Sequence, residues 1–197
     1  LAHQHPGETM AGFCAEGLVD RLLDESDETA AALLARAEVY VVPRMNPDGS
    51  AIGNHRTNAA GRDLNREWSS PSEEASPEVA CVRRALEERG VDLFLDLHGD
   101  ESVPYVYAYG ARGIGGYTER LAALEDRFCG ALARIDPDFQ RERTRDKDLP
   151  GDGDLRLATS YVADRFDCLS LGIEMPFTDN LLRPDPEQGW SPERSRS

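Results

Sequence analysis

The apolar positions of the chain follow two spacings, one typical of helices and one typical of strands. Between residues 8 and 23 they recur with a period close to 3.6, which predicts a helix with one buried face. Helical spacing or helix-end signals predict four more helices, over residues 28–37, 76–90, 117–134 and 155–166. Short apolar runs predict strands over residues 39–43, 91–98, 103–109 and 168–174.

The order of these segments predicts the fold class. Helices alternate with short strands, which is typical of an α/β protein with a central sheet and helices on both faces. With 197 residues and no internal repeat, the chain has the length of one domain. Residues 183–197 are rich in Pro, Arg and Ser, and we expect them to form a flexible tail.

Residues 44–76 show neither spacing and are rich in Asn, Gly, Pro, Asp and Ser, so we expect a long loop. Loops of this length in compact domains are usually either functional or disordered. Function is the better interpretation, because the segment carries many planar hydrogen-bond donors, among them Arg56, Asn65 and Arg66.

Composition narrows the choice of partners. A formal net charge of -15 and a pI near 4.6 argue against nucleic acid or an anionic membrane, which both attract basic surfaces. No apolar run approaches the ~18 residues of a membrane-spanning helix, and no signal peptide opens the chain, so we expect a cytoplasmic protein. Cys14, Cys81, Cys129 and Cys168 are widely spaced, which predicts free thiols.

Two histidines and a glutamate stand where predicted elements begin or end. His5-Pro6-Gly7-Glu8 places an imidazole and a carboxylate three residues apart, on a turn that leads into the first helix. His98 closes a predicted strand, at the sheet edge where α/β proteins bind ligands. Each residue alone has an ordinary alternative, a surface turn or a buried histidine. Together they form a His₂Glu set, the ligand type of hydrolytic zinc sites that keep a position open for water.

A further carboxylate closes the last predicted strand. Glu174 follows an apolar run, and an unpaired carboxylate beside a core strand is costly. A salt bridge would satisfy it, and so would a role as general base beside a metal-activated water. Arg56, Asn65 and Arg66 add donors suited to a carboxylate ligand, although a loop arginine can also be a solvated charge.

Four blocks, in this order, resemble the signature of the zinc carboxypeptidases of the carboxypeptidase A superfamily: His5-Pro6-Gly7-Glu8, Gly61-Arg62-Asp63-Leu64-Asn65-Arg66, Leu97-His98 and Gly172-Ile173-Glu174. Further blocks are similar to its cytosolic carboxypeptidase-like branch: Arg44-Met45-Asn46-Pro47-Asp48-Gly49, Gly53-Asn54-His55-Arg56, Asp96-Leu97-His98-Gly99 and Glu174-Met175-Pro176-Phe177. The resemblance implies a mixed central sheet in an α/β/α arrangement over residues 1–182. It also implies that family strands preceding the zinc motif are missing here.

Position by position, the resemblance implies that His5, Glu8 and His98 bind one Zn²⁺ ion. Glu174 would be the general base that activates the zinc-bound water. Arg56 would stabilise the oxyanion that develops on the scissile carbonyl. The activity implied is hydrolysis of the C-terminal peptide bond of a peptide or protein tail.

Further positions concern the substrate. The resemblance implies that Asn65 and Arg66 hold the terminal carboxylate, which restricts hydrolysis to the last residue. Arg145, Lys147 and Arg156 are candidates for a basic pocket that accepts acidic side chains, with solvated charges as the alternative.

A mobile tyrosine of the family has no counterpart in residues 148–153, and Tyr161 is a weak substitute because it falls in a predicted helix. Two alternatives to the carboxypeptidase stay open. One is an amidase or deacylase of the same fold that acts on a small N-acyl or cell-wall peptide substrate. The other is a truncated zinc-binding fragment without catalytic activity.

Overall fold

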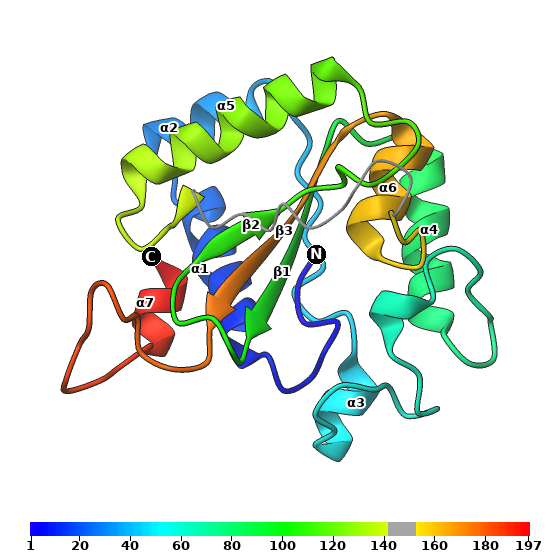
Figure 1. Cartoon of the computed structure of the whole chain (residues 1–197), viewed down its shortest axis with the longest axis horizontal. Coiled ribbons are helices and arrows are strands. Elements are labelled where there is room, and N and C mark those ends of the chain that lie inside the picture. The colour runs from blue at the N-terminus through cyan, green and yellow to red at the C-terminus, as the bar shows by residue number, and fades with distance from the viewer. Residues whose placement is uncertain (142–152) are drawn as a thin grey trace.

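A three-stranded mixed sheet lies at the centre of the computed structural model, which describes residues 1–141 and 153–197 (Figure 1). Its strands are β1 (Leu93–Asp100), β2 (Tyr107–Tyr109) and β3 (Leu169–Pro176), in the order β1-β3-β2. β3 runs parallel to β1 and antiparallel to β2. The α/β fold class is therefore confirmed, and β2 is shorter than predicted.

The register of the sheet brings the predicted catalytic residues together. On β1 and β3, His98 pairs with Glu174, and on the other side of β3 the same Glu174 pairs with Tyr107. Paired residues of neighbouring strands point to the same face of a sheet. His98 and Glu174 therefore share one face and one end of the sheet.

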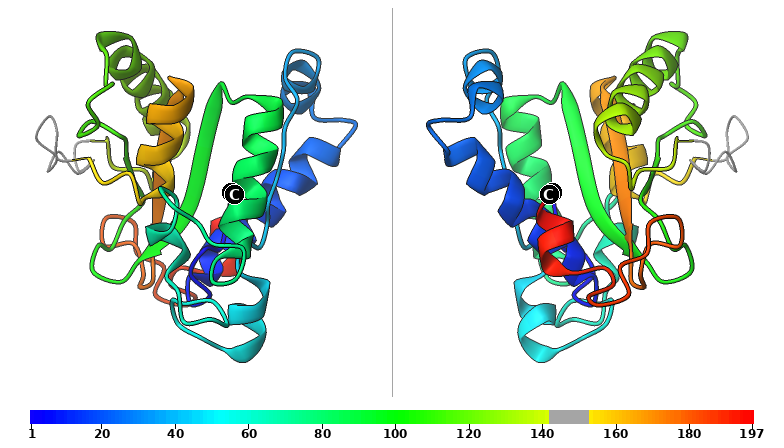
Figure 2. Two further views of the ribbon diagram at one scale, coloured as in Figure 1. Left: turned by 90° about the vertical axis from the view of Figure 1, so that its right-hand side faces the viewer. Right: turned by 90° about the vertical axis from the view of Figure 1, so that its left-hand side faces the viewer.

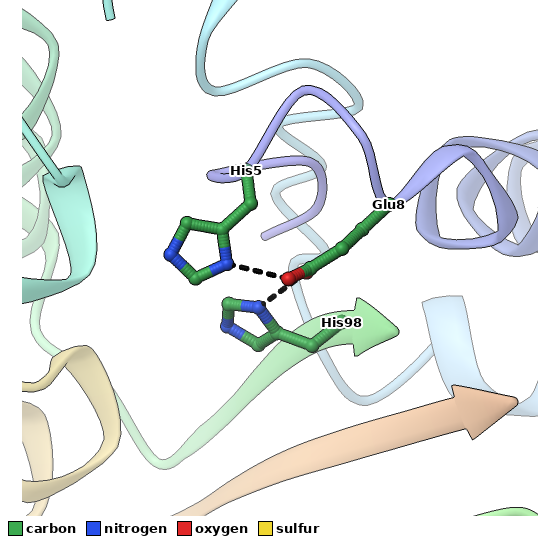
Figure 3. A group of neighbouring side chains, drawn as sticks. All are labelled: His5, Glu8 and His98. Atoms are coloured by element: carbon green, nitrogen blue, oxygen red, sulfur yellow. Dashed lines mark hydrogen bonds and ion pairs between the residues drawn. The ribbon is translucent and has the colours of Figure 1, made fainter. Parts of the chain in front are cut away.

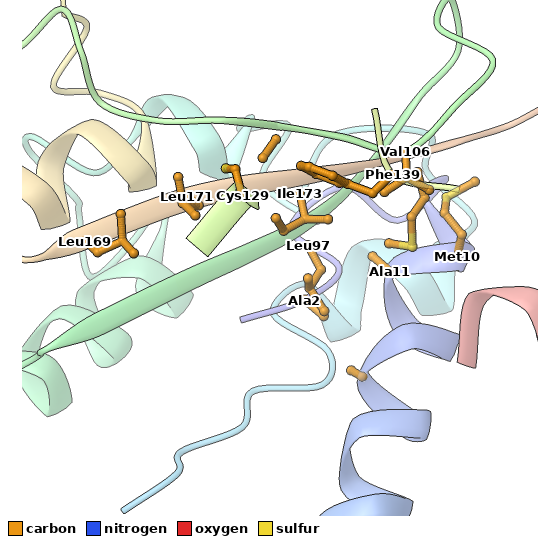
Figure 4. Packing of buried hydrophobic residues seen from close by; sticks show 13 residues of the cluster. Ala2, Met10, Ala11, Leu97, Val106, Cys129, Phe139, Leu169, Leu171 and Ile173 are labelled. Atoms are coloured by element: carbon orange, nitrogen blue, oxygen red, sulfur yellow. The ribbon is translucent and has the colours of Figure 1, made fainter. Parts of the chain in front are cut away.

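Two buried clusters cover the two faces. Strand alternation sends Leu97 of β1 and Leu171 of β3 to one face, where they pack with residues of α1 (Thr9–Leu23) and α5 (Glu119–Ile135) (Figure 4). Phe94 points to the opposite face, towards α4 (Pro77–Arg89) and α6 (Ala158–Phe166), which stand together on the right in Figure 1. Each fully buried aliphatic side chain contributes about 1.5–3 kcal/mol. The sheet face opposite His98 and Glu174 is thus packed against a buried core.

All five predicted helices are present, and the fifth is α2 (Glu28–Leu34). N-terminal caps explain where α2 and α5 begin. Asp27 accepts from the backbone N–H of Ala30 at 3.0 Å, and Thr118 accepts from that of Leu121 at 3.3 Å. Among the described helices, none is both long and apolar enough to cross a membrane.

The strand predicted over residues 39–43 is wrong. The segment carries no regular ladder, and Val39 and Tyr40 are 37% and 59% exposed. Its neighbour is the short stretch around Ala2, whose N–H donates to the carbonyl of Val42 at 2.9 Å. Ala2 in turn bridges to Leu97 at the edge of β1. A β-branched run favours extended backbone, but a strand also needs a partner along its length.

The expected loop over residues 44–76 contains two short helices, α3 (Pro47–Ile52) and the 3-10 helix η1 (Leu64–Arg66). Asn46 caps α3 by accepting from the N–H of Gly49 at 3.0 Å, with Pro47 at the first position. Asp63 caps η1 by accepting from the N–H of Asn65 at 3.0 Å. Local side-chain bonds thus give the loop a defined path, without the long apolar spacing that predicts helices.

Where the sequence predicts a flexible tail, the structure has helix α7 (Pro192–Arg196), which packs against α1 (Figure 2). Arg194 holds it in place through Asp138, with Nε 2.8 Å from Oδ2, and Arg196 pairs with Glu16 of α1. Gly17 permits this contact, because a Cβ there would lie 2.1 Å from the carbonyl oxygen of Arg196. Asp138 and Glu16 lie far from α7 in the sequence, so the composition of residues 183–197 gives no sign of these contacts.

Candidate metal centre

His5, Glu8 and His98 form a compact buried cluster (Figure 3). Glu8 lies between the two rings: its Oε1 is 2.7 Å from Nδ1 of His5, and its Oε2 is 2.8 Å from Nδ1 of His98. One ligand atom from each residue lies within 4.8 Å of the others. Nitrogen and oxygen donors at this spacing suit Zn²⁺, which takes His and Glu ligands at about 2.0–2.2 Å.

A tight turn brings the first two donors together. The N–H of Glu8 donates to the carbonyl of His5 at 3.1 Å, and α1 begins at the next residue. Gly7 is required at this turn, because a Cβ there would lie 2.9 Å from the backbone oxygen of His55 and 2.7 Å from its ring. The third donor comes from β1, so the cluster joins the turn to the sheet.

The far nitrogen of each imidazole faces a carboxylate. Nε2 of His5 is 3.0 Å from Oδ1 of Asp63, and Nε2 of His98 is 2.7 Å from Oδ2 of Asp96. In metal sites, such pairs fix the ring orientation and place the proton on the nitrogen that faces the carboxylate, which here would leave Nδ1 available to a metal ion. Sequence reasoning missed both aspartates. The available signal was local: Asp96 precedes His98 by two residues on one strand face, and Asp63 lies in the Gly61-to-Arg66 block.

The cluster is organised by charge. Burial alone would raise the pKa of Glu8, but hydrogen bonds to both histidines lower it to about 2. Burial would likewise lower the pKa of His98, yet Asp96 and Glu8 hold it well above its usual value. Asp63, in spite of its burial, has a pKa below its usual value because of His5 and Arg56. Several carboxylates surround two imidazoles, and this excess of negative charge favours binding of a divalent cation. The histidines lose protons when such a cation binds. The donor set therefore fits zinc.

Glu174 is a different kind of carboxylate. Burial raises its pKa to about 7; His98 opposes this shift, and Glu8 and Asp100 reinforce it. Its Oε2 is inaccessible to water and has no hydrogen-bond partner among the described residues. A carboxylate with a pKa near neutrality can both accept and return a proton at physiological pH.

One cavity of about 700 Å³ connects these groups. Its wall includes all seven residues predicted for the site, which are His5, Glu8, Arg56, Asn65, Arg66, His98 and Glu174. Tyr109 of β2 also lines it and was not predicted, because alternation along a strand does not reveal which face borders a cavity.

The three polar residues of the loop differ in their contacts. Arg56 is half-buried, and its Nε donates to Oδ2 of Asp63 at 2.8 Å. Arg66 is exposed, and one of its terminal nitrogens donates to the carbonyl of Asn65 at 2.7 Å. Asn65 is buried: its Oδ1 accepts from the N–H of Ala158 at 2.8 Å, and its Nδ2 lies 3.4 Å from Nε2 of His98.

The other predicted residues do not join this site. Arg156 is exposed and pairs with Asp154 at 2.8 Å, away from the cavity wall. Tyr161 packs against Trp68, with 6.2 Å between ring centroids, and also lies outside that wall. Arg145, Lys147 and residues 148–152 lie outside the described residues.

Comparison with known proteins agrees with this geometry. The family model described as zinc carboxypeptidase matches residues 1–188. A metallo-carboxypeptidase from Pseudomonas aeruginosa, solved in complex with (2-guanidinoethylmercapto)succinic acid, is 49% identical with a TM-score of 0.95. One from Burkholderia cenocepacia is 46% identical with a TM-score of 0.92. Each alignment covers 98% of this chain and 51% of the solved chain.

Cytosolic carboxypeptidase 3 from Bos taurus is 41% identical over 128 residues, which are 62% of this chain and 12% of the bovine protein. The chain thus spans about half the length of the two solved relatives and a smaller part of the bovine one. The family match runs through every block that forms the cavity, from His5 to Glu174. This chain belongs to the zinc carboxypeptidase family.

Proposed function

We propose that this cavity hydrolyses the C-terminal peptide bond of a peptide or protein tail in a zinc-dependent reaction. The observation that carries the proposal is the joint placement, in one cavity, of a buried His₂Glu donor set, a carboxylate with a pKa of about 7, and two arginines. Membership of the zinc carboxypeptidase family supports it. The named cytosolic relatives support a cytoplasmic location as part of the same proposal.

The donors His5, Glu8 and His98 would hold the zinc ion. When bound, zinc supplies a Lewis acid that makes a water molecule more acidic and polarises the scissile carbonyl. Glu174 takes the proton from the attacking water and delivers it to the leaving amine, for which its raised pKa is suited. Arg56, whose guanidinium is oriented by Asp63, donates to the oxyanion that forms on the carbonyl.

Selection of the last residue falls to the exposed side of the cavity. Arg66 offers a planar guanidinium to the terminal carboxylate of the substrate, and such pairs are commonly bidentate. The Nδ2 group of Asn65 is the second donor. The dicarboxylic acid bound by the Pseudomonas relative is consistent with carboxylate recognition in this family.

A release assay tests the proposal. Zinc-loaded protein is incubated with a peptide that ends in a free carboxylate, with the same peptide amidated at its end, and with an N-acyl amino acid, and the released amino acid is measured by mass spectrometry. We expect release from the free-carboxylate peptide, loss of release in excess chelator, and a decrease of ~10²–10⁴-fold in Glu174→Gln.

Each alternative predicts a different result. Equal release from the amidated peptide would remove the proposed role of Arg66. Release from the N-acyl amino acid alone would indicate a deacylase, and zinc binding without any release would indicate a non-catalytic module. Wild-type activity in Glu174→Gln would refute the general-base assignment.

A further inference from the structure

Gln4 is a fully buried amide directly before a proposed metal ligand, and the mechanism above does not use it. Its Nε2 donates to Oδ2 of Asp96 at 2.7 Å, and its Oε1 accepts from the indole N–H of Trp68 at 2.9 Å. Its backbone carbonyl accepts from the side chain of Asn46 at 2.9 Å. A buried amide without hydrogen-bond partners costs free energy. Both polar atoms of the Gln4 amide have such partners, so the surrounding structure accommodates this side chain specifically.

The partners of Gln4 fix the direction of its amide. The indole nitrogen of Trp68 can only donate, so the carbonyl end of the Gln4 amide must face it and the NH₂ end must face Asp96. In a reversed amide, the NH₂ group would face the indole N–H of Trp68, and the carbonyl oxygen would face a carboxylate oxygen of Asp96. Neither pair could form a hydrogen bond. The side chain therefore has a single orientation, with its NH₂ group towards Asp96.

One atom of Asp96 connects Gln4 to the metal cluster. Oδ2 of Asp96 accepts from Gln4 and also faces Nε2 of His98, each at 2.7 Å. The other oxygen of Asp96, Oδ1, is buried without a partner among the described residues. Among the described residues, Gln4 and His98 are thus the side chains that hold this carboxylate in position.

At its other end Gln4 reaches the substrate side. Trp68 is fully buried and stands two residues after Arg66, directly beyond helix η1. The hydrogen-bonded chain Trp68–Gln4–Asp96–His98 therefore links the segment that carries Asn65 and Arg66 to a metal donor.

We propose that Gln4 is a positioning residue: through Asp96 it sets the orientation of His98, and through Trp68 it keeps that ring in register with the carboxylate-binding segment. The proposal rests on the metal site of the proposed function. Without the Gln4 amide, the carboxylate of Asp96 can rotate and no longer holds the His98 ring in one orientation. The affinity of the site for the metal ion then falls. Loss of a group that directly contacts a metal ligand typically weakens binding by ~10–100-fold. Gln4 acts through such a group, Asp96, so we expect the lower end of this range.

The test is a double-mutant cycle on zinc affinity, measured on the folded 197-residue chain by competition with a chromophoric chelator. Gln4→Met keeps the length of the side chain and removes both hydrogen bonds. We expect it to weaken zinc binding by ~10-fold in the wild-type background but by less than ~2-fold in Asp96→Ala, where the oxygen shared by Gln4 and His98 is absent. Trp68→Phe removes the N–H donor together with part of the buried indole ring and leaves the bond from Gln4 to Asp96 in place, so it should have a smaller effect of the same sign.

Val79→Ala is the matched control. Val79 is fully buried in the same hydrophobic cluster as Trp68, but it takes no part in the hydrogen-bonded path from Trp68 to His98. It should lower stability and leave zinc affinity unchanged. The ¹⁵N signals of His98 add a second readout, since in Gln4→Met its Nε2–H signal should shift or broaden. Equal weakening by Gln4→Met in both backgrounds, or an effect no larger than that of Val79→Ala, would overturn the proposal. If the wild-type chain binds no zinc, the proposed function itself fails.

Discussion

The two halves of the cavity are built differently. In the metal half, His5, Glu8 and His98 are 3%, 6% and 2% exposed, and both nitrogens of each ring face a carboxylate. In the substrate half, Asn65 is buried, Arg56 is half-buried and Arg66 is exposed, so burial decreases towards the solvent. Each guanidinium has five N–H donors, and the recorded bonds engage Nε of Arg56 and one terminal nitrogen of Arg66.

The difference matches what each half has to do. Metal donors must be held within about half an ångström of their working positions, which requires buried partners on every side. A site that receives a peptide end from solvent needs donors that are still available when the ligand arrives. Asp63 joins the halves, because one of its oxygens faces His5 and the other accepts from Arg56. We expect substitutions in the metal half to abolish zinc binding and chemistry, and those in the substrate half to act on individual kinetic constants.

The largest effect is expected from His98→Ala. Removal of one of three donors should abolish stoichiometric zinc binding and lower the release rate by at least ~10³-fold, because the lost Lewis acid contributes several kcal/mol. Elemental analysis of dialysed protein and the release assay measure the two effects. His55→Ala is the control: His55 lines the same cavity but is exposed and pairs with Glu101. Stoichiometric zinc in His98→Ala would contradict the ligand assignment.

Arg56→Met should have the next largest effect, and it tests whether the substrate half takes part in the chemistry. Loss of an oxyanion donor lowers kcat by ~10²–10³-fold and changes KM little. At saturating zinc the content should stay at one ion per chain, because all three donors remain. The bond from Arg56 to Asp63, a partner of His5, predicts a lower zinc affinity, as for Gln4→Met. A variant with unchanged kcat would assign the oxyanion role to another group.

Arg66→Met should act on KM instead. A charge-assisted hydrogen bond to a carboxylate contributes about 1.5–3 kcal/mol, so KM should rise by ~10–100-fold while kcat changes little. Arg156→Met is the matched control, because Arg156 is equally cationic but pairs with Asp154 outside the cavity. Equal effects of the two substitutions would show that overall charge, and not position, attracts the substrate.

The same division explains what could be predicted from sequence. His5 and Glu8 were found because one turn holds both, and His98 and Glu174 because an ionisable residue that closes an apolar strand is conspicuous. Local pattern marked these residues as candidates, whereas their individual roles came from the family resemblance. Gln4, which also precedes a ligand, gave no such signal, because its role depends on Asp96 and Trp68, 92 and 64 residues away.

The differences between the expected and the observed fold have the same cause. Residues 39–43 have strand propensity, but pairing around Ala2 leaves most of the segment without a ladder. The C-terminal residues have the composition of a tail, yet α7 is held by Asp138 and Glu16. In each case, contacts across the fold outweigh local preference.

Glu174 lies between the two halves in burial, and its ionisation gives the smallest predicted effect. In metal-free protein its pKa is about 7, raised by burial from an ordinary value of 4.5. Between these pH values the folded state keeps a proton that the unfolded state has lost, so unfolding becomes easier as the pH rises. Below pH 4.5 and above pH 7 this contribution is constant.

Glu174→Gln removes this dependence. Urea unfolding in excess chelator should therefore show the wild type losing about 1–2 kcal/mol relative to the variant as the pH rises from 5 to 8, less than the full shift implies because the residue keeps some contact with cavity water. Ionisation of His5 and His98 is common to both proteins and cancels in the difference to first order. A difference that stays flat, or that favours the wild type as the pH rises, would place Glu174 with the stabilised carboxylates of the metal half, and the contrast between a structural and a reactive carboxylate in this cavity would be lost.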